Sequence, residues 1–207
     1  MSAYIAACYP GRVEMVSDGA SFDFDGKIEA MRSKITPSDL LPLAVVGVGV
    51  VGDIALLKVA VLEATQACST VDEVIERLHT DLPRVERRST PSSITIVAFS
   101  ESSGGQIWEY NNERKTLRPY WDSHAIGPEL SMDEMRASGA DITQSLREGG
   151  VRLLEAMRRK PCQPVQEVPF GHYVGGHIDW CVVDKNGVRI ERVHEWPDVV
   201  GEKIEVA

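Results

Sequence analysis

The chain opens with the stretch that decides the fold, SAYIAACYPGRVEMVSDGASFDFDGKIEAMRSK at residues 2–34. Within this stretch Ser2, Asp18 and Lys34 stand sixteen residues apart. Removal of Met1 would place Ser2 at the very start of the chain. Two turn signals lie between the three residues, and together they predict that all three side chains meet at one place.

The first turn signal is Pro10-Gly11, which separates two short runs of β-forming residues at 4–8 and 13–17. Such a dipeptide between two β-type runs predicts a hairpin. A turn centred there places Asp18 opposite Ala3, next to the start of the chain.

The second turn signal is Asp25-Gly26, a dipeptide that favours a two-residue hairpin because both positions tolerate positive φ. Carried back in regular register, this turn sets Ser17 opposite Lys34. A β-bulge in either hairpin would shift the pairing by one residue and reverse the face of the side chain. Two independent turns nevertheless predict the same meeting point.

The chemistry that these residue types allow at one place is specific. A serine hydroxyl is a weak nucleophile, and the chain's own α-amine, with a reference pKa of about 8, accepts its proton near neutral pH. A buried lysine at Lys34 would keep that amine neutral, and Asp18 would hold the lysine charged and oriented. The glycine-rich segment 43–53 lets backbone amides approach a developing oxyanion closely.

Further features extend this pattern along the chain. They are a serine at the start of the first strand (Ser2), a Val-x-x-x-Ser-Asp-Gly run that ends at Gly19, and Lys34, sixteen residues after the aspartate. They also include a strand that enters a glycine-rich turn at residues 45–49 and a late run with a Gly-Gly pair at residues 173–187. With these features the chain resembles the proteasome β-subunit superfamily of N-terminal-nucleophile hydrolases, and most closely its bacterial ring peptidase branch.

The resemblance implies a set of roles and partners. Ser2 takes the position of the catalytic nucleophile, Asp18 and Lys34 that of its supporting pair, and Gly47 that of the oxyanion amide. A member of this superfamily is a peptidase or amidohydrolase that acts on a peptide substrate, needs no cofactor or metal, and works within an oligomer. We therefore expect a homo-oligomer in which the helices after Gly52 and the C-terminal tail make the contacts.

Three positions depart from the superfamily pattern. The supporting serine of a Gly-Ser-Gly segment is absent from residues 125–129, which read AIGPE. An aspartate and a serine ahead of the late Gly-Gly pair are replaced by Gly171 and Val174. These departures favour an alternative, in which the chain is a catalytically inactive structural or assembly subunit of a ring, a particle or a phage-type structure.

The order of elements supports the same fold. Residues 52–68 are apolar on most sides, which suits a helix between two layers, and a capping box at Thr70 begins a second helix that ends near Pro83. Residues 131–160 read as helical with breaks near Gly139 and near Gly149-Gly150. Strands are expected at 93–100, 106–110, 176–183 and 188–194. This order predicts an α+β fold, a four-layer αββα sandwich, in a single domain over residues 1–207.

Composition sets the remaining bounds. The chain has 207 residues and a formal net charge of −9, which disfavours binding to nucleic acid. No segment is long enough to span a membrane and no signal peptide is evident, so we expect a cytoplasmic protein. Neither the four cysteines nor His172 and His177 have the spacing of metal ligands. Residues 196–198 and the acidic tail after them read as an exposed segment that docks a neighbouring subunit.

Overall fold

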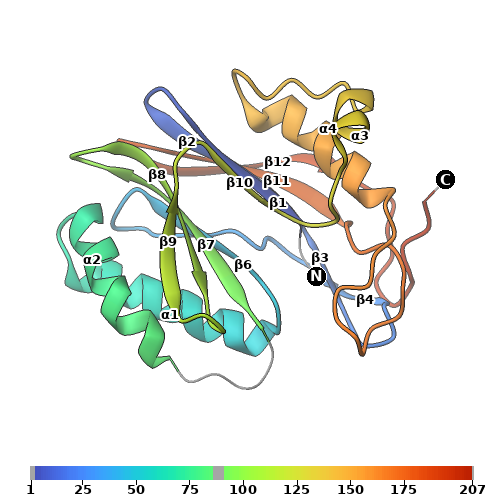
Figure 1. The fold of residues 1–207 in the computed structure, drawn as a ribbon, viewed down its shortest axis with the longest axis horizontal. Helices are drawn as coiled ribbons and strands as arrows, with labels where there is room; N and C mark the ends of the chain where they lie inside the picture. Colours follow the sequence, from blue (N-terminus) through green and yellow to red (C-terminus); the bar gives the residue numbers. More distant parts are fainter. Residues whose placement is uncertain (1–2, 86–90, 207) are drawn as a thin grey trace.

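The computed structural model describes residues 3–85 and 91–206. Its mixture of helices and strands confirms the predicted α+β class. One five-stranded sheet has the strand order β10-β1-β2-β11-β12. Its strands are β1 (Tyr4–Tyr9), β2 (Arg12–Asp18), β10 (Ser123–Ile126), β11 (His177–Asp184) and β12 (Gly187–Glu195). We call it the N-terminal sheet, because the first strand of the chain lies within it (Figure 1).

A second five-stranded sheet, here called the central sheet, has the order β5-β6-β7-β8-β9. A separate two-stranded hairpin joins the two sheets in sequence. The strands of the central sheet are β5 (Thr36–Pro37), β6 (Leu43–Val48), β7 (Ser93–Ser100), β8 (Gly104–Asn111) and β9 (Thr116–Tyr120), and those of the hairpin are β3 (Ala20–Phe22) and β4 (Ile28–Met31). Both β9 and β10 were missing from the sequence-based expectation.

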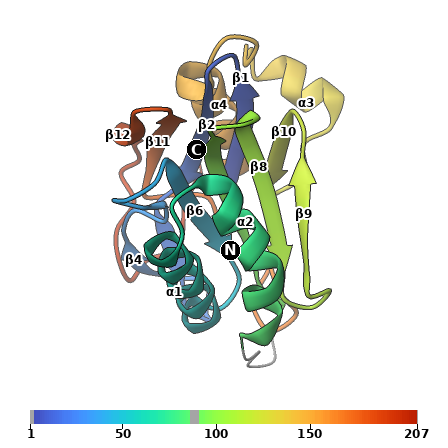
Figure 2. The same cartoon turned by 90° about the vertical axis from the view of Figure 1, so that its left-hand side faces the viewer.

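Helices cover the outer faces of the two sheets, as Figure 1 and Figure 2 show. On the central sheet, α1 (Val51–Ala67), α2 (Val71–Asp81) and the short 3₁₀ helix η1 (Leu82–Arg84) pack on one face. On the N-terminal sheet, α4 (Leu146–Arg158) packs on the outer face, and α3 (Met132–Ala137) precedes it. The inner faces of the two sheets pack on each other through a core that includes Tyr4, Met15, Val46, Val97 and Ile107.

The first hairpin forms in the predicted register. Tyr9 pairs with Arg12, so Pro10 and Gly11 form the turn, and Gly11 has a φ of 76°. Beyond the last pair of the two strands, the Asp18 amide donates to the Ala3 carbonyl at 3.0 Å. The turn chemistry at Pro10-Gly11 therefore fixes Asp18 opposite Ala3, as predicted.

The second hairpin differs from the prediction in two ways. Phe22 pairs with Ile28, so the connection spans residues 23–27 and not only Asp25-Gly26, and a bulge between Ser21 and Phe22 restores the expected register farther along. Ser17 does not pair with Lys34, because β1 and β11 already occupy both edges of β2 at that residue. The chain leaves the N-terminal sheet at Gly19 instead.

The helices differ from the prediction in two further ways. α1 is not enclosed between layers, because its outward face is open, with Leu56 and Val59 42% and 50% exposed. The expected helix at 131–160 breaks at Gly139, which has a φ of 64°, but continues through Gly149-Gly150. A side chain on Gly149 would meet the Asp141 carbonyl oxygen at 2.1 Å, so these glycines permit close packing and do not end the helix.

The C-terminal segment makes contacts that the sequence did not predict. It folds back onto its own chain, since the Ile28 amide donates to the Glu202 carbonyl and the Gly201 amide donates to the Ile28 carbonyl. Ile204 is buried beside β3 and β4. Most of the segment is nevertheless exposed, as expected, including Val199 and Val200.

Candidate active site

Asp18 and Lys34 meet in a buried ion pair at the end of β2. The Lys34 Nζ donates to Asp18 Oδ1 at 2.8 Å, and the two side chains are 10% and 0% exposed. The backbone amide of Ala3 donates to the same oxygen at 2.9 Å, and the amide of Gly175 donates to Oδ2 at 3.3 Å. The carboxylate is therefore the point at which three separate segments of chain converge.

Burial makes the lysine of this pair unusual. Loss of hydration lowers the pKa of Lys34 below its ordinary value, although the neighbouring Asp18 carboxylate opposes that shift. The positive charge of Arg32 lowers the pKa of Lys34 further. A lysine of this kind can exchange a proton more readily than an exposed one, and this property suits a group that tunes a nucleophile.

Ser2 lies outside the described residues. The residue that follows it, Ala3, is held on both sides, because its amide bonds to the Asp18 side chain and its carbonyl accepts from the Asp18 amide. Gly127, from the loop after β10, also comes close: a side chain there would meet the Ala3 Cβ at 3.1 Å. The start of the first strand is thus fixed against the ion pair and against the segment at 125–129.

Gly47 lies near the end of β6, in the central sheet. The Phe99 amide donates to the Pro42 carbonyl, and the Ser38 amide donates to the Leu43 carbonyl. Because hydrogen-bonded pairs alternate along antiparallel strands, both bonds direct the Gly47 amide away from β7 and toward the β5 edge. That edge is the one that carries Lys34.

Close packing also explains the glycine at this position. A side chain on Gly47 would meet the Ile54 side chain of α1 at 2.6 Å, and one on Gly49 would meet Ser92 at 2.3 Å. Gly49 in addition has a φ of 130°. The glycines of this turn therefore let α1 approach β6, whatever else the Gly47 amide does.

The segment at 174–176 is a support that the sequence did not reveal. The amides of Gly19 and Ala20 both donate to the Gly175 carbonyl, at 3.1 and 3.0 Å. Arg158 in turn donates to the Val174 carbonyl at 2.9 Å and forms a bidentate pair with Asp198 at 2.6 and 2.8 Å.

This support begins far from the site in sequence. Asp198 accepts from the Gly176 amide at 2.7 Å, so the C-terminal segment holds the backbone that holds Asp18. Both members of the Arg158–Asp198 pair are at least nine-tenths buried. An arginine at the end of a helix and an aspartate 40 residues later give no local signal of this contact.

Lys58 is another residue that sequence reasoning missed. Its Nζ donates to the Lys34 carbonyl at 2.5 Å and to the Thr36 hydroxyl at 3.1 Å. Burial, together with the positive charges of Arg32 and Lys34, lowers the pKa of Lys58 to about 8. Its spacing of four residues from Ile54, which places both residues on one side of the helix, was the available signal.

Two solved structures have folds similar to that of this chain. The chain is similar to the Anbu Gly-1 mutant from Hyphomicrobium sp. strain MC1, with a TM-score of 0.69 and 10% identity over 94% of this chain and 87% of that one. It is similar to Anbu, described as an ancestral β-subunit, from Yersinia bercovieri, with a TM-score of 0.68 and 10% identity over 94% and 88% of the two chains.

The chain has a proteasome-like fold. At 10% identity the likeness concerns the fold alone. No protein-family model and no curated protein matches the sequence. Among the described residues, no helix is long and apolar enough to cross a membrane.

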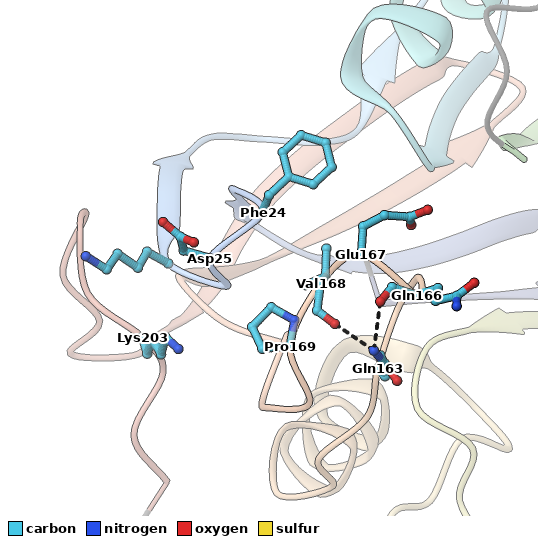
Figure 3. A pocket seen from close by; sticks show the side chains of 9 residues that line it. Phe24, Asp25, Gln163, Gln166, Glu167, Val168, Pro169 and Lys203 are labelled. Carbon is cyan, nitrogen blue, oxygen red and sulfur yellow. Dashed lines mark hydrogen bonds between the residues drawn. The ribbon is translucent and has the colours of Figure 1, made fainter.

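An open hollow lies apart from the ion pair, at the tip of the β3–β4 hairpin. It has a volume of about 630 Å³, and its wall includes Phe24 and Lys27 from the hairpin loop, the segment at 166–169, and Lys203. In Figure 3 the Gln163 side chain donates to two backbone carbonyls of its own loop, those of Gln166 at 3.1 Å and Val168 at 2.9 Å. Neither Asp18 nor Lys34 borders this hollow, so we do not include it in the candidate site.

Proposed function

We propose that the protein is an N-terminal-nucleophile hydrolase, a peptidase or amidohydrolase in which Ser2 attacks after removal of Met1. The observation that carries the proposal is the buried Asp18–Lys34 pair, together with the Ala3 amide that it fixes. The proteasome-like fold supports the proposal, because it allows the described layers to be interpreted as the αββα sandwich of this superfamily in one domain over residues 1–207.

In this proposal the Ser2 hydroxyl oxygen attacks the carbonyl carbon of an amide, and the α-amine of Ser2 accepts the hydroxyl proton. The Gly47 amide donates to the oxyanion, and Lys34 keeps the α-amine neutral. The carbon–nitrogen bond then breaks, and the leaving amine takes the proton. Water hydrolyses the resulting ester and restores Ser2.

A second candidate is a catalytically inactive subunit of the same fold, which builds a ring or another assembly. The replacements at the superfamily's supporting positions favour it, because the segment 125–129 holds no serine, and Gly171 and Val174 have no side-chain hydroxyl or carboxylate. In both candidates we propose a homo-oligomer in the cytoplasm. The open face of α1 is the contact surface that we propose, because it exposes apolar side chains.

Replacement of Ser2 by alanine tests the proposal. We expect Ser2→Ala to abolish turnover of a panel of fluorogenic peptide amides while leaving the melting temperature and the sedimentation coefficient unchanged, because only the attacking oxygen is lost. Lys34→Ala should lose nearly as much activity. Turnover that persists in Ser2→Ala at the wild-type rate would exclude the mechanism.

A further inference from the structure

A partly buried lysine of α1, Lys58, donates to a backbone carbonyl that would otherwise accept a hydrogen bond within the central sheet. The Lys58 Nζ lies 2.5 Å from the Lys34 carbonyl oxygen and 3.1 Å from the Thr36 hydroxyl. Both acceptors belong to the segment that leads from the ion pair with Asp18 into β5. Lys58 therefore ties α1 to the backbone on which the candidate site is built.

The strand register shows what this contact replaces. Thr36 pairs with Val45, and hydrogen-bonded pairs recur at every second residue of an antiparallel ladder. The next such pair in this direction is Lys34 with Gly47. Within residues 3–85 and 91–206, no hydrogen bond joins the Gly47 amide to the Lys34 carbonyl, which accepts from Lys58 instead.

From this geometry we propose that Lys58 is a positioning residue that ends the β5–β6 ladder one pair early and so keeps the Gly47 amide available as an oxyanion donor. The role rests on the proposed hydrolase function. Lys58 touches neither the nucleophile nor the substrate in this account. It acts through Lys34, whose carbonyl it holds, and through Gly47, whose amide it leaves unpaired.

Burial supports a role other than stability for this lysine. The lowered pKa means that the folded protein disfavours the charged amine relative to the unfolded chain, so an apolar side chain of similar length would be tolerated. The charged groups that act on Lys58 are Arg32 and Lys34, and both are positive. Lys58 is therefore a cation beside two other cations, and its acceptor is the Lys34 carbonyl. It holds that carbonyl in position but lowers the stability of the fold.

The test compares three variants with the wild-type protein. Lys58→Met removes the donor and the charge but keeps the length of the side chain. Lys58→Arg keeps the donor and the charge. Lys185→Met is the control, a lysine-to-methionine change at an exposed turn between β11 and β12. Crystal structures give the distance from the Gly47 nitrogen to the Lys34 oxygen. The rate constant for labelling of Ser2 by a saturating epoxyketone gives the effect on the reaction.

We expect the Gly47–Lys34 distance to exceed about 3.5 Å in the wild-type protein and to close to about 3 Å in Lys58→Met. The labelling rate constant should fall by about 10- to 100-fold in that variant, with the half-saturating reagent concentration unchanged, because an oxyanion donor is lost. Lys58→Arg should restore most of the rate, and Lys185→Met should match the wild-type protein.

Two results would overturn the proposal. One is a Gly47–Lys34 hydrogen bond that is already present in the wild-type crystal structure. This result can be obtained even if none of the variants folds. The other is an unchanged distance and rate in Lys58→Met. Absence of labelling in a wild-type protein with Ser2 at its terminus would end the hydrolase proposal instead, and the distance would still decide whether Lys58 interrupts the ladder.

Discussion

At the scale of residues, the site depends on the hydrogen bonds that the Asp18 carboxylate accepts. Asp18 accepts hydrogen bonds from the Lys34 amine and from the amides of Ala3 and Gly175, and its side chain is fully buried. A buried ion pair contributes little net stability, but removal of one partner leaves the other charge uncompensated. The pair is therefore better understood as a means of positioning than as a source of stability.

This asymmetry gives a prediction for the ion pair. Lys34→Met should lower the free energy of unfolding by about 3 kcal/mol, because the Asp18 carboxylate stays buried without its cation. Lys27→Met, at an exposed lysine in the loop of the β3–β4 hairpin, should change it by less than about 0.5 kcal/mol. Urea unfolding at pH 7 measures both values. Equal values for the two variants would mean that the ion pair is not formed in solution.

The same residues show what the sequence could predict. Pro10-Gly11 carries a strong local turn signal, and the register that it predicts places Asp18 opposite Ala3, as observed. The path from Gly26 to Lys34 was not predicted correctly, because Ser17 pairs with Tyr4 and Asp179 and not with Lys34. Lys58 and the Arg158–Asp198 pair were not predicted, because their partners are far away in sequence. Such contacts depend on how layers pack, and no local pattern encodes them.

At the scale of elements, α4 is anchored to the N-terminal sheet by one buried acid. Glu14 of β2 accepts from the Arg12 side chain at 2.6 Å, from the Ser145 hydroxyl at 2.8 Å, from the Leu146 amide at 2.7 Å and from the Trp180 indole at 2.9 Å. These bonds fix the first turn of α4 on the sheet that also carries Asp18.

Protonation of Glu14 should weaken this anchor. Burial raises the pKa of Glu14, but the four hydrogen bonds together outweigh burial, so its pKa lies below the ordinary value of 4.5. Its contribution to stability is therefore complete above about pH 4.5 and is lost as the pH falls through the lower, folded-state pKa. Glu14→Gln should cost about 2 kcal/mol at pH 7 and flatten the fall in stability below pH 4.5.

Denaturant unfolding between pH 3 and pH 7 measures the effect. Glu113→Gln, in the exposed turn between β8 and β9, is the matched control and should leave the pH profile unchanged. A profile for Glu14→Gln as steep as that of the wild-type protein would show that other acids cause the loss of stability.

Element boundaries also show where sequence reasoning ended. A capping box was predicted at Thr70, and half of it forms. The Thr70 hydroxyl accepts from the Glu73 amide, but the Glu73 side chain accepts from the Ser69 amide and not from that of Thr70. The strands β9 and β10 were missed, because residues 116–126 include Pro119 and lack the alternation that marks a half-buried strand. Pairing with β8 and β1, and not local propensity, makes these segments strands.

At the scale of the whole molecule, α1 exposes three large apolar side chains on the surface that we propose as a contact between subunits. Val51, Leu56 and Val59 are each between 42% and 50% exposed on one helix. The C-terminal tail, by contrast, is largely bound to its own chain through Asp198 and Ile204. An assembly that buries α1 would therefore explain the apolar composition of a helix that the fold leaves half open.

The assembly proposal predicts the effect of a charge on this face. Val59→Glu should shift the sedimentation coefficient toward that of a single chain, because a carboxylate would be buried without a partner in the contact. Lys185→Glu, at the exposed turn between β11 and β12, should leave the assembly intact. A wild-type protein that sediments as a monomer at tens of micromolar would contradict the proposal.

The central claim is that Ser2, once exposed by loss of Met1, is a nucleophile served by its own α-amine. Intact-mass spectrometry of the protein from its native host, before and after treatment with an epoxyketone, tests this claim most directly, because the reagent requires a free amine and a hydroxyl on the same residue. We predict a starting mass that lacks Met1 and a single adduct that Ser2→Ala abolishes. A protein whose mass proves that Ser2 is terminal and that remains unlabelled would contradict the account.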